Sequence, residues 1–352
     1  MTIDAMEITV RVSGAPAEGV LVFQVYDSPD TFSDLRDPAQ EIVVQARGDG
    51  DYLLPDVNGA RIALFVYFDE NANGLVDKNF IGIPKERLAF SNNYRPIGPP
   101  SFVRASFELP LPDNGPLEME MYRLLGKRGR LGVGAGVVGR SSPYVGSTKS
   151  VTQVIPGITY VGERLQWFGP ALRYGIAGSG RFRLAAVAEY RIGSYEETDS
   201  LVLSGLGDRD STLMAGLGLQ YEIANGFELD LAYRHDVLDR IGGGEANARL
   251  SRGVPVGPVT FVPQLSMNWL GEELSNYDFG VPLAAATAGR PAYALGSTTS
   301  YELGLGVFLE LSEHWQFVMD LAIERLDDEV VASPLVEERN VVKGFATISY
   351  VF

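Results

Sequence analysis

The segment from Asp69 to Asp77 has oxygen-bearing side chains at alternate positions, which is the spacing of a calcium-binding loop. The predicted ligands at loop positions 1, 3, 5, 7 and 9 are Asp69, Asn71, Asn73, the backbone carbonyl of Leu75, and Asp77. Gly74 stands where such a loop turns sharply, but position 12 is Phe80 and not a bidentate glutamate. The alternative is an Asx-rich turn whose side chains bond their own backbone. We predict a structural Ca²⁺ site and no other cofactor.

The dipeptide His235-Asp236 is a second place where residue types suggest chemistry. It lies at the outer end of a predicted strand, and Asp208, Arg209 and Asp210 end the preceding long loop. One hypothesis is a hydrolase at the rim of a barrel, with His235 as general base. The alternative is a charged rim with a hydrogen-bonded histidine. The chain has only two histidines and no paired nucleophile motif near either, so we predict that the protein is not an enzyme.

The elements that position these residues fall into two parts. Residues 1–121 hold nine Lys/Arg and nineteen Asp/Glu, a balance of -10, whereas the remaining residues have a balance of -6. The segment 122–130 is rich in basic residues and glycine and is interpreted as a linker. We therefore predict a first domain over 1–121 and a second over 131–352.

Short alternating runs fill the first part, and Gly, Pro and Asp break them. Examples are Met6–Val12, Gly19–Tyr26 and Ile62–Phe68. Such runs are typical of a small antiparallel β-sandwich. About 120 residues suffice for a core of its own.

Longer runs with the same period of two fill the second part. In Arg181–Ile192, Phe182, Leu184 and Tyr190 lie on one face, and Arg183, Glu189 and Arg191 on the other. Ordinary strands average about five or six residues, whereas these runs have the length of a tilted strand that crosses a bilayer. The sequence therefore predicts an all-β protein with a carboxyl-terminal transmembrane antiparallel barrel.

The runs predict about twelve barrel strands (range roughly 10 to 14), an even number as in single-chain bacterial barrels. The least certain division separates 164–168 from 170–177, where the apolar face switches across Phe168-Gly169-Pro170. A turn explains the switch, and so would a bulge, which would lower the count. An even count places both barrel ends and the first domain in the periplasm, and the long segments 193–210, 237–244, 270–298 and 326–340 outside.

The inward faces are predicted to carry charges of both signs. They are Arg181, Arg183, Glu189, Arg191, Glu222, Glu228, Asp230, Arg234, Arg249, Glu302, Asp320, Glu324 and Lys343. One interpretation is a channel. The other, which we favour, is a network of ion pairs that fills or constricts a lumen of intermediate width.

Composition excludes several classes of protein. A formal charge of -16 disfavours nucleic acid as a partner, and no apolar run is long enough for a transmembrane helix. The absence of Cys removes thiol catalysis and disulfides and suits an envelope compartment. No signal peptide is present in the first residues, and we expect that it is missing from this numbering.

The last strand has apolar residues at alternate positions up to Phe352. The segment looks like the sorting signal of bacterial outer-membrane barrels, and the residues that carry it are Lys343, Gly344, Phe345, Tyr350 and Phe352.

Several motifs of the second part together resemble one family, the MltA-interacting protein (MipA)/OmpV family of outer-membrane barrels. The motifs are Ser142-Pro143-Tyr144-Val145-Gly146, Pro156-Gly157-Ile158-Thr159-Tyr160, Tyr233-Arg234-His235-Asp236, Tyr277-Asp278-Phe279-Gly280-Val281 and Tyr350-Val351-Phe352. Residues 5–122 are similar to a small exported domain family of unassigned function, through Asp69–Asp77, Gly82-Ile83-Pro84 and Phe90-Ser91-Asn92-Asn93.

The resemblance implies a location in the outer membrane of a Gram-negative cell, with lipid as the surroundings of the barrel. It also implies a scaffold that joins a lytic transglycosylase to a murein synthase, so that proteins of murein synthesis and hydrolysis are the expected partners. The first domain would then be a periplasmic partner-binding domain. The alternatives are a channel or transporter for small solutes and, third, the rim hydrolase.

Overall fold

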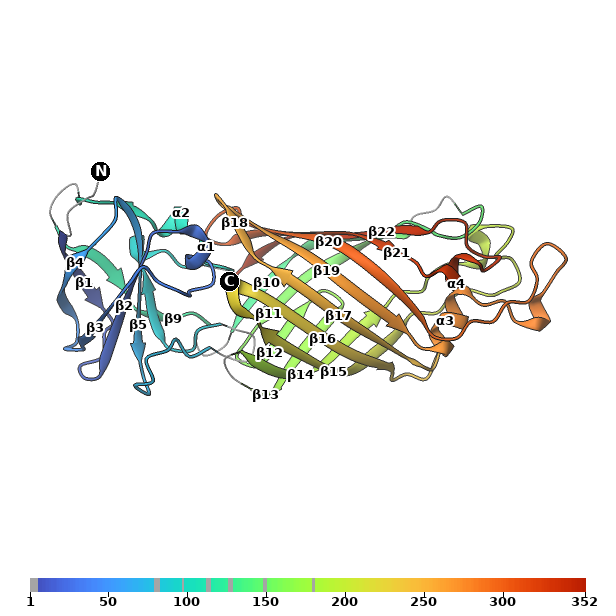
Figure 1. Cartoon of the computed structure of the whole chain (residues 1–352), viewed down its shortest axis with the longest axis horizontal. Coiled ribbons are helices and arrows are strands. Elements are labelled where there is room, and N and C mark those ends of the chain that lie inside the picture. Colours follow the sequence, from blue (N-terminus) through green and yellow to red (C-terminus); the bar gives the residue numbers. More distant parts are fainter. Residues whose placement is uncertain are drawn as a thin grey trace.

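The computed structural model of the chain describes residues 6–78, 83–96, 98–111, 115–125, 129–147, 151–178 and 181–352. A small first domain and a longer barrel lie end to end along the long axis of the molecule (Figure 1). Within these ranges, no helix is both long and apolar enough to cross a membrane.

The first domain is a two-sheet sandwich. Its strands are β1 (Met6–Ser13), β2 (Val20–Tyr26), β3 (Gln40–Gln45), β4 (Gly50–Val57), β5 (Arg61–Asp69), β6 (Arg87–Phe90), β7 (Phe107–Glu108), β8 (Leu117–Glu120) and β9 (Tyr122–Arg123). One sheet has the order β4-β1-β8 and the other β3-β2-β5-β6-β9, and β7 pairs with β5. β8 pairs with β1 in parallel, so the sandwich differs from the predicted antiparallel arrangement at this edge. The chain reaches β8 from the other sheet and not through a hairpin with β1.

The central strands β2 and β5 of the second sheet are buried on both faces. Inward-facing Val10 of β1 packs with Phe23 and Leu64 between the two sheets. On the other face, Phe65 and Tyr67 pack under a layer of short helices. Burial on both faces explains why β5 is an almost continuous apolar run, since neither face has to be polar.

The layer of short helices lies between the sandwich and the barrel. It consists of α1 (Pro29–Phe32), η1 (Ser91–Asn93) and α2 (Phe102–Ala105). Ser28 caps α1 by accepting the N–H of Asp30, and Phe32 packs edge to face against Phe90 and Phe102. The aromatic contacts fix the layer on the sheet.

The second part is a closed antiparallel barrel. Its strands are β10 (Arg130–Arg140), β11 (Val151–Val161), β12 (Leu165–Phe168), β13 (Ala171–Ala177), β14 (Phe182–Arg191), β15 (Thr212–Glu222), β16 (Phe227–Asp236), β17 (Gly244–Arg252), β18 (Val254–Val256), β19 (Val259–Leu270), β20 (Thr298–Glu310), β21 (Trp315–Arg325) and β22 (Asn340–Val351). Each strand pairs with the next, and β22 pairs with β10 to close the ring. β18 continues β17 beyond Gly253, and both pair with β19, so the barrel has the predicted twelve strands.

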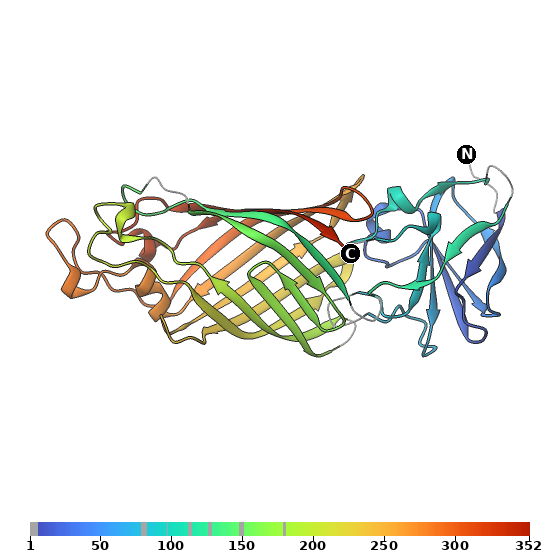
Figure 2. The same cartoon turned by 180° about the vertical axis from the view of Figure 1, so that it is seen from behind.

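A hairpin accounts for the switch of apolar face near Gly169. Leu165 pairs with Tyr174 and Phe168 with Ala171, and Gly169 takes the left-handed φ of +51°. The prediction of two strands joined by a turn is confirmed. The hairpin is shorter than the strands around it (Figure 2).

The pairing register separates an inner from an outer face on every strand. Arg173 of β13 reaches Asp230 of β16, which lies three strands away, so both side chains must point into the barrel. The predicted inward charges share this face, except Arg181, which lies in the turn before β14. Exposed Leu217, Leu303 and Ile323 are on the outer face. Since charged and apolar residues alternate, the wall is polar inside and apolar outside.

Long loops gather at one end of the barrel, here called the loop end. They contain η2 (Glu197–Asp199), α3 (Glu272–Phe279), η4 (Leu283–Ala285) and α4 (Asp328–Val331). Tyr144, Leu203, Phe279 and Leu335, from four different loops, belong to one buried apolar cluster. These loops start on different sides of the ring, so their contact requires them to cross over the mouth. The opposite end, here called the turn end, has short turns, including η3 (Ala224–Gly226), and faces the first domain.

Candidate functional site

The Asp69 loop is closed by its own hydrogen bonds. The carboxylate of Asp69 accepts the backbone N–H groups of Asn73 (3.1 Å) and Gly74 (2.8 Å). Asp77 accepts the side-chain amides of Asn71 (2.7 Å) and Asn73 (3.1 Å). These are the bonds of the Asx-turn alternative, and they also bring loop positions 1, 3, 5 and 9 together.

The calcium site stays a prediction. Among the described residues, no group of three or more His, Asp or Glu side chains is arranged to hold a metal ion. Leu75 is exposed, and Phe80 lies outside the described residues.

A buried glutamate that the sequence analysis missed fixes the ends of this loop. The two carboxylate oxygens of Glu86 accept the N–H groups of Glu70 (3.0 Å) and Asp77 (3.1 Å). Glu86 is 2% exposed, and burial raises its pKa to about 7. No local pattern marks this residue, because its partners lie in a loop that precedes it.

His235 and Asp236 point to opposite sides of the barrel wall. His235 is exposed on the outer face, whereas Asp236 is buried and binds Thr212 Oγ1 at 2.5 Å. Asp236 also accepts the N–H groups of Leu238 (3.1 Å) and Ile241 (2.7 Å), so it shapes the turn after β16. The alternation of a strand therefore separates the two residues that the rim-hydrolase hypothesis needs together.

The neighbouring loop residues are used for packing. Arg209 stacks on Tyr195 and Tyr277, with its guanidinium carbon 4.7 Å and 4.8 Å from the ring centroids. The Asp210 N–H donates to the hydroxyl of Tyr277 at 2.6 Å. These contacts hold the loop after β14 against α3.

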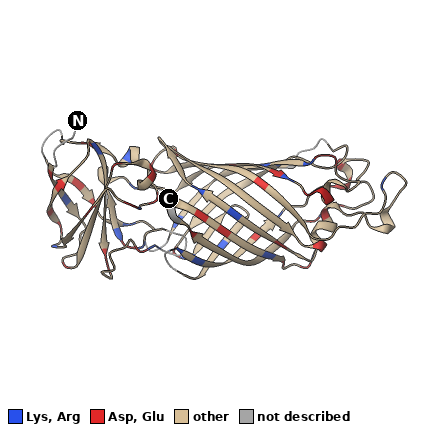
Figure 3. Cartoon of the chain, viewed as in Figure 1, with Lys and Arg blue, Asp and Glu red and all other residues tan. Residues whose placement is uncertain are grey.

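The inner face of the barrel carries chains of ion pairs. The closest atoms are 2.6 Å apart in Arg234–Glu189, 2.7 Å in Lys343–Glu324 and 3.1 Å in Arg183–Glu228. The Glu189 and Glu228 side chains remain 40% and 38% exposed, so the lumen is not filled around them. Figure 3 shows charged residues along the barrel strands and acidic residues in the loops. Paired charges avoid the cost of an isolated charge inside the barrel.

A buried ion pair lies beneath the loops at the loop end. Asp278 of α3 is 1% exposed and accepts hydrogen bonds from Arg191 Nη2 (2.7 Å) and the Ser194 hydroxyl (3.0 Å). Burial opposes ionisation, but the nearby Arg191 guanidinium outweighs it and lowers the pKa of Asp278. The pair ties the long loop before β20 to the end of β14.

Glu310, at the turn end of β20, is a buried contact between the barrel and the first domain. Its carboxylate accepts the Tyr94 hydroxyl at 2.6 Å and lies 3.4 Å from Arg104 Nη1. The Arg104 guanidinium also donates to the Glu310 backbone carbonyl at 3.0 Å. Glu310 is 5% exposed, so a carboxylate is held out of water by two groups of the other domain.

Three further contacts lie around the same mouth. Arg130 of β10 donates to the carbonyl of Pro96, and Lys78 lies 3.9 Å from Glu222 of β15. Gly98 packs so closely on inward-facing Phe308 that an added Cβ would lie 2.3 Å from the ring. Since β10, β15 and β20 are well separated in the ring, the domain spans the turn-end mouth.

The predicted sorting segment lies in β22 and at its end. Lys343 and Phe345 face the lumen, whereas Gly344 and Tyr350 face outward. The Tyr350 ring packs against Trp315 and Phe352, with centroid distances of 5.5 Å and 5.0 Å. Its role in sorting stays a prediction.

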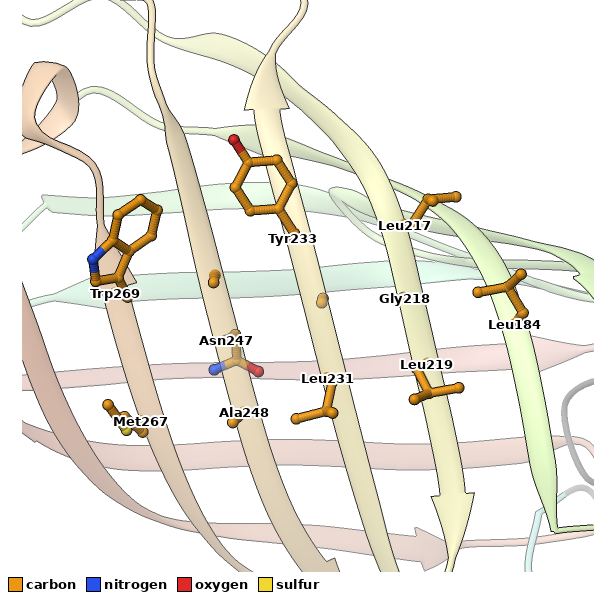
Figure 4. A pocket seen from close by; sticks show the side chains of 12 residues that line it. Leu184, Leu217, Gly218, Leu219, Leu231, Tyr233, Asn247, Ala248, Met267 and Trp269 are labelled. Carbon is orange, nitrogen blue, oxygen red and sulfur yellow. The ribbon is translucent and has the colours of Figure 1, made fainter.

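A hollow of about 380 Å³ on the outer wall of the barrel is almost entirely apolar. Leu217, Leu231, Tyr233, Met267 and Trp269 surround it, as Figure 4 shows. It faces away from the lumen ion pairs, so it is part of the lipid-facing surface and contains no reactive groups.

Residues 133–352 match the model of the family described as MltA-interacting protein MipA. Residues 10–115 match a family described as uncharacterized proteins conserved in bacteria (DUF2141). Outer membrane protein Omp26La of Vibrio anguillarum is 28% identical over 159 residues, and outer membrane protein OmpV of Vibrio cholerae is 26% identical over 159 residues. Each match covers 45% of this chain and 62% of the relative, so the chain spans less than two thirds of either.

Solved barrels align only weakly with this chain. The NanC porin aligns with a TM-score of 0.34 and 11% identity, over 62% of this chain and 98% of that chain. The CymD monoaromatic hydrocarbon channel aligns with a TM-score of 0.32 and 13% identity, over 65% of this chain and 89% of that chain. The family match over the whole barrel, together with its outer-membrane relatives, places the chain in the MipA family of outer-membrane β-barrel proteins, as the sequence motifs predicted.

Proposed function

We propose that this protein is a non-enzymatic outer-membrane scaffold whose barrel anchors a periplasmic partner-binding domain. The observation that carries the proposal is the docking of the first domain across the turn-end mouth through Glu310, Tyr94 and Arg104. A domain held in this way keeps one orientation at the membrane. The loops packed over the other mouth also favour an anchor over an open pore.

The sheet β4-β1-β8 faces away from the barrel and supplies the proposed binding surface. Leu53 is 54% exposed on it, and Arg11 binds Asp51 (2.7 Å) and Glu118 (3.4 Å) nearby. An exposed leucine among mostly acidic residues is complementary to a partner surface on which basic residues surround an apolar patch. The family description names MltA as an interaction partner. We therefore propose MltA as a partner, together with the predicted proteins of murein synthesis and murein hydrolysis.

A pull-down with the full-length protein in detergent tests the proposal. Purified MltA is the bait, and Leu53→Arg is expected to abolish capture. Val43→Arg is the matched control, because Val43 is 61% exposed on a different sheet. Equal capture of both variants would move the partner surface elsewhere, and no capture of the unaltered protein would remove MltA as the partner.

A solute channel is the second candidate. The partly exposed ion pairs of the lumen favour it, since water-accessible charges of both signs suit small polar solutes. Conductance across planar bilayers separates the two proposals. The scaffold proposal expects a silent, stably inserted barrel, whereas steady conductance by the unaltered protein would support the channel.

A structural Ca²⁺ ion at Asp69–Asp77 is a further proposal. The convergence of Asp69, Asn71, Asn73 and Asp77 in one loop supports it. The ion would stiffen the loop and take no part in chemistry.

A further inference from the structure

The hydrogen-bonded wall of the barrel is interrupted beside β11. β11 has eleven residues, all paired with β10, yet only Thr159–Val161 pair with β12. One more bond joins the Gly169 N–H to the Ile158 carbonyl, at 3.1 Å. Because β12 and β13 turn back at Gly169, the loop-end half of β11 continues beyond its neighbour.

The backbone of β11 at Val154 and Pro156 forms a free edge on the side of β12. Since the Ile158 carbonyl points toward β12, the backbone groups of Val154 and Pro156 point to the same side. In the described part of the chain, neither residue has a backbone partner there. Proline has no N–H to leave unpaired, which is why proline in a sheet occurs on edges. It also makes the edge a poor template for an added strand, because one donor is missing.

Inside the barrel, this stretch of wall carries several apolar side chains, with Gln153 and Thr347 as polar neighbours. By register, Ile155 faces the lumen opposite Gly136, and Gln153 faces it opposite Val138. Phe345 of β22 and Phe168 of β12 also face the lumen, next to β10 and β11 respectively. Phe168 is 40% and Phe345 39% exposed although both point inward, so the space before them is not filled by other side chains. Ion pairs border this patch, because Lys343 lies two residues from Phe345 on the same inward face of β22, and other ion pairs lie farther round the lumen.

Outside the barrel, the wall around the interruption is apolar as well. Val137, Val154 and Ile158 face outward, and Val154 is 83% exposed. A free edge bordered by apolar side chains on both faces therefore separates lipid from an apolar part of the lumen.

We propose that the interruption between β11 and the β12–β13 hairpin is a lateral port through which the acyl chain of a membrane lipid reaches the patch formed by Val138, Ile155, Phe168 and Phe345. The acyl chain of the lipid replaces water on these four side chains, and the lipid headgroup stays outside the barrel wall. Burial of apolar surface on both partners drives the binding. The proposal is independent of the scaffold function, since it concerns the barrel wall and not the first domain.

Because the chain has no cysteine, single cysteines report access to the lumen. Full-length Phe345→Cys in lipid vesicles is treated either with a dodecyl-substituted maleimide or with a sulfonated, membrane-impermeant maleimide. We expect the dodecyl reagent to react faster by roughly tenfold or more, because each methylene favours partition from water into lipid. Ile348→Cys, outward on the same strand, is the positive control, and Val262→Cys, inward on β19, is expected to react slowly with both.

Three results would overturn the proposal. Equal modification of Phe345→Cys by the impermeant reagent would mean access through the mouths, and no modification by either would mean a sealed wall. Fast modification of Val262→Cys by the dodecyl reagent would mean that access is not local to the port. Folding is checked by heat-dependent electrophoretic mobility, and Phe168→Cys carries the same test if Phe345→Cys does not fold. Ile155→Trp, which places a larger side chain beside Gly169, is expected to slow the reaction of Phe345→Cys.

Discussion

The hydroxyl group of Tyr94 joins the two domains, and its removal tests whether the periplasmic domain is held on the barrel. The substitution Tyr94→Phe removes the hydroxyl that donates a hydrogen bond to the Glu310 carboxylate at 2.6 Å. The ion pair between Glu310 and Arg104 Nη1, at 3.4 Å, remains. A hydrogen bond to a buried charged group contributes roughly 1.5–3 kcal/mol. Since about 1.4 kcal/mol is a factor of ten, the docked state should lose about 10- to 100-fold in its equilibrium constant.

Hydrogen–deuterium exchange in the full-length protein measures this loss. We expect faster exchange in Tyr94→Phe for the backbone of α2 and for the turn between β20 and β21. Tyr122→Phe is the matched control, because the buried hydroxyl of Tyr122 has no hydrogen-bond partner among the described residues. Its removal should leave exchange unchanged.

A double-mutant cycle with Glu310→Gln separates the domain contact from effects inside the first domain. The Tyr94 hydroxyl also accepts the Ser101 N–H at 3.3 Å, so Tyr94→Phe alone perturbs both. If the contact with Glu310 dominates, the two substitutions should be non-additive by more than about 1 kcal/mol. Additive effects, or equal exchange in Tyr94→Phe and Tyr122→Phe, would refute the account of the docked domain.

Three other predictions concern single carboxylates. Ca²⁺ should raise the melting temperature of the first domain in the unaltered protein and not in Asp69→Ala; no shift in either removes the site. Because burial raises the pKa of Glu86 to about 7 from 4.5, the folded domain holds this proton more tightly than the unfolded chain, and stability should fall by up to roughly 3 kcal/mol as pH rises through this window. Exchange of β5 amides should show this slope in the unaltered protein and not in Glu86→Gln, and stability that rises between these pH values contradicts it. Asp278→Asn removes the nearer of the two carboxylates that pair with Arg191 and leaves Glu245 at 3.7 Å, at a cost of up to about 3 kcal/mol, so external protease should cleave the loops faster. Asp328→Asn is the control, because Asp328 is an exposed partner of Arg339 and water screens this ion pair. Equal cleavage in both variants would contradict the role of Asp278.

The alternation of residues along each strand was enough to predict the barrel, its strand number and its two faces. A strand such as β14 faces lipid on one side and the lumen on the other. Alternate residues are therefore apolar or polar according to the side that they face, and this pattern can be seen in the sequence of one strand. The turn at Gly169 was also visible, because a hairpin exchanges odd and even residues between faces. The motifs of the second part predicted the family for the same reason, since they are local.

Only the tertiary structure brought together the residues that organise the molecule. Tyr94 and Glu310 are 216 positions apart, and each has the appearance of an ordinary surface residue in the sequence. Glu86 binds a loop that precedes it, the parallel pairing of β8 joins distant strands, and the free edge of β11 depends on where its neighbour ends. Such contacts form only when the folded chain brings distant residues together. A hydrogen bond depends on the distance between its two atoms in space, so the periodic pattern of a single strand does not predict it. The sequence by itself therefore determined what each strand faces, and the tertiary structure decided what closes each mouth and where the wall is interrupted.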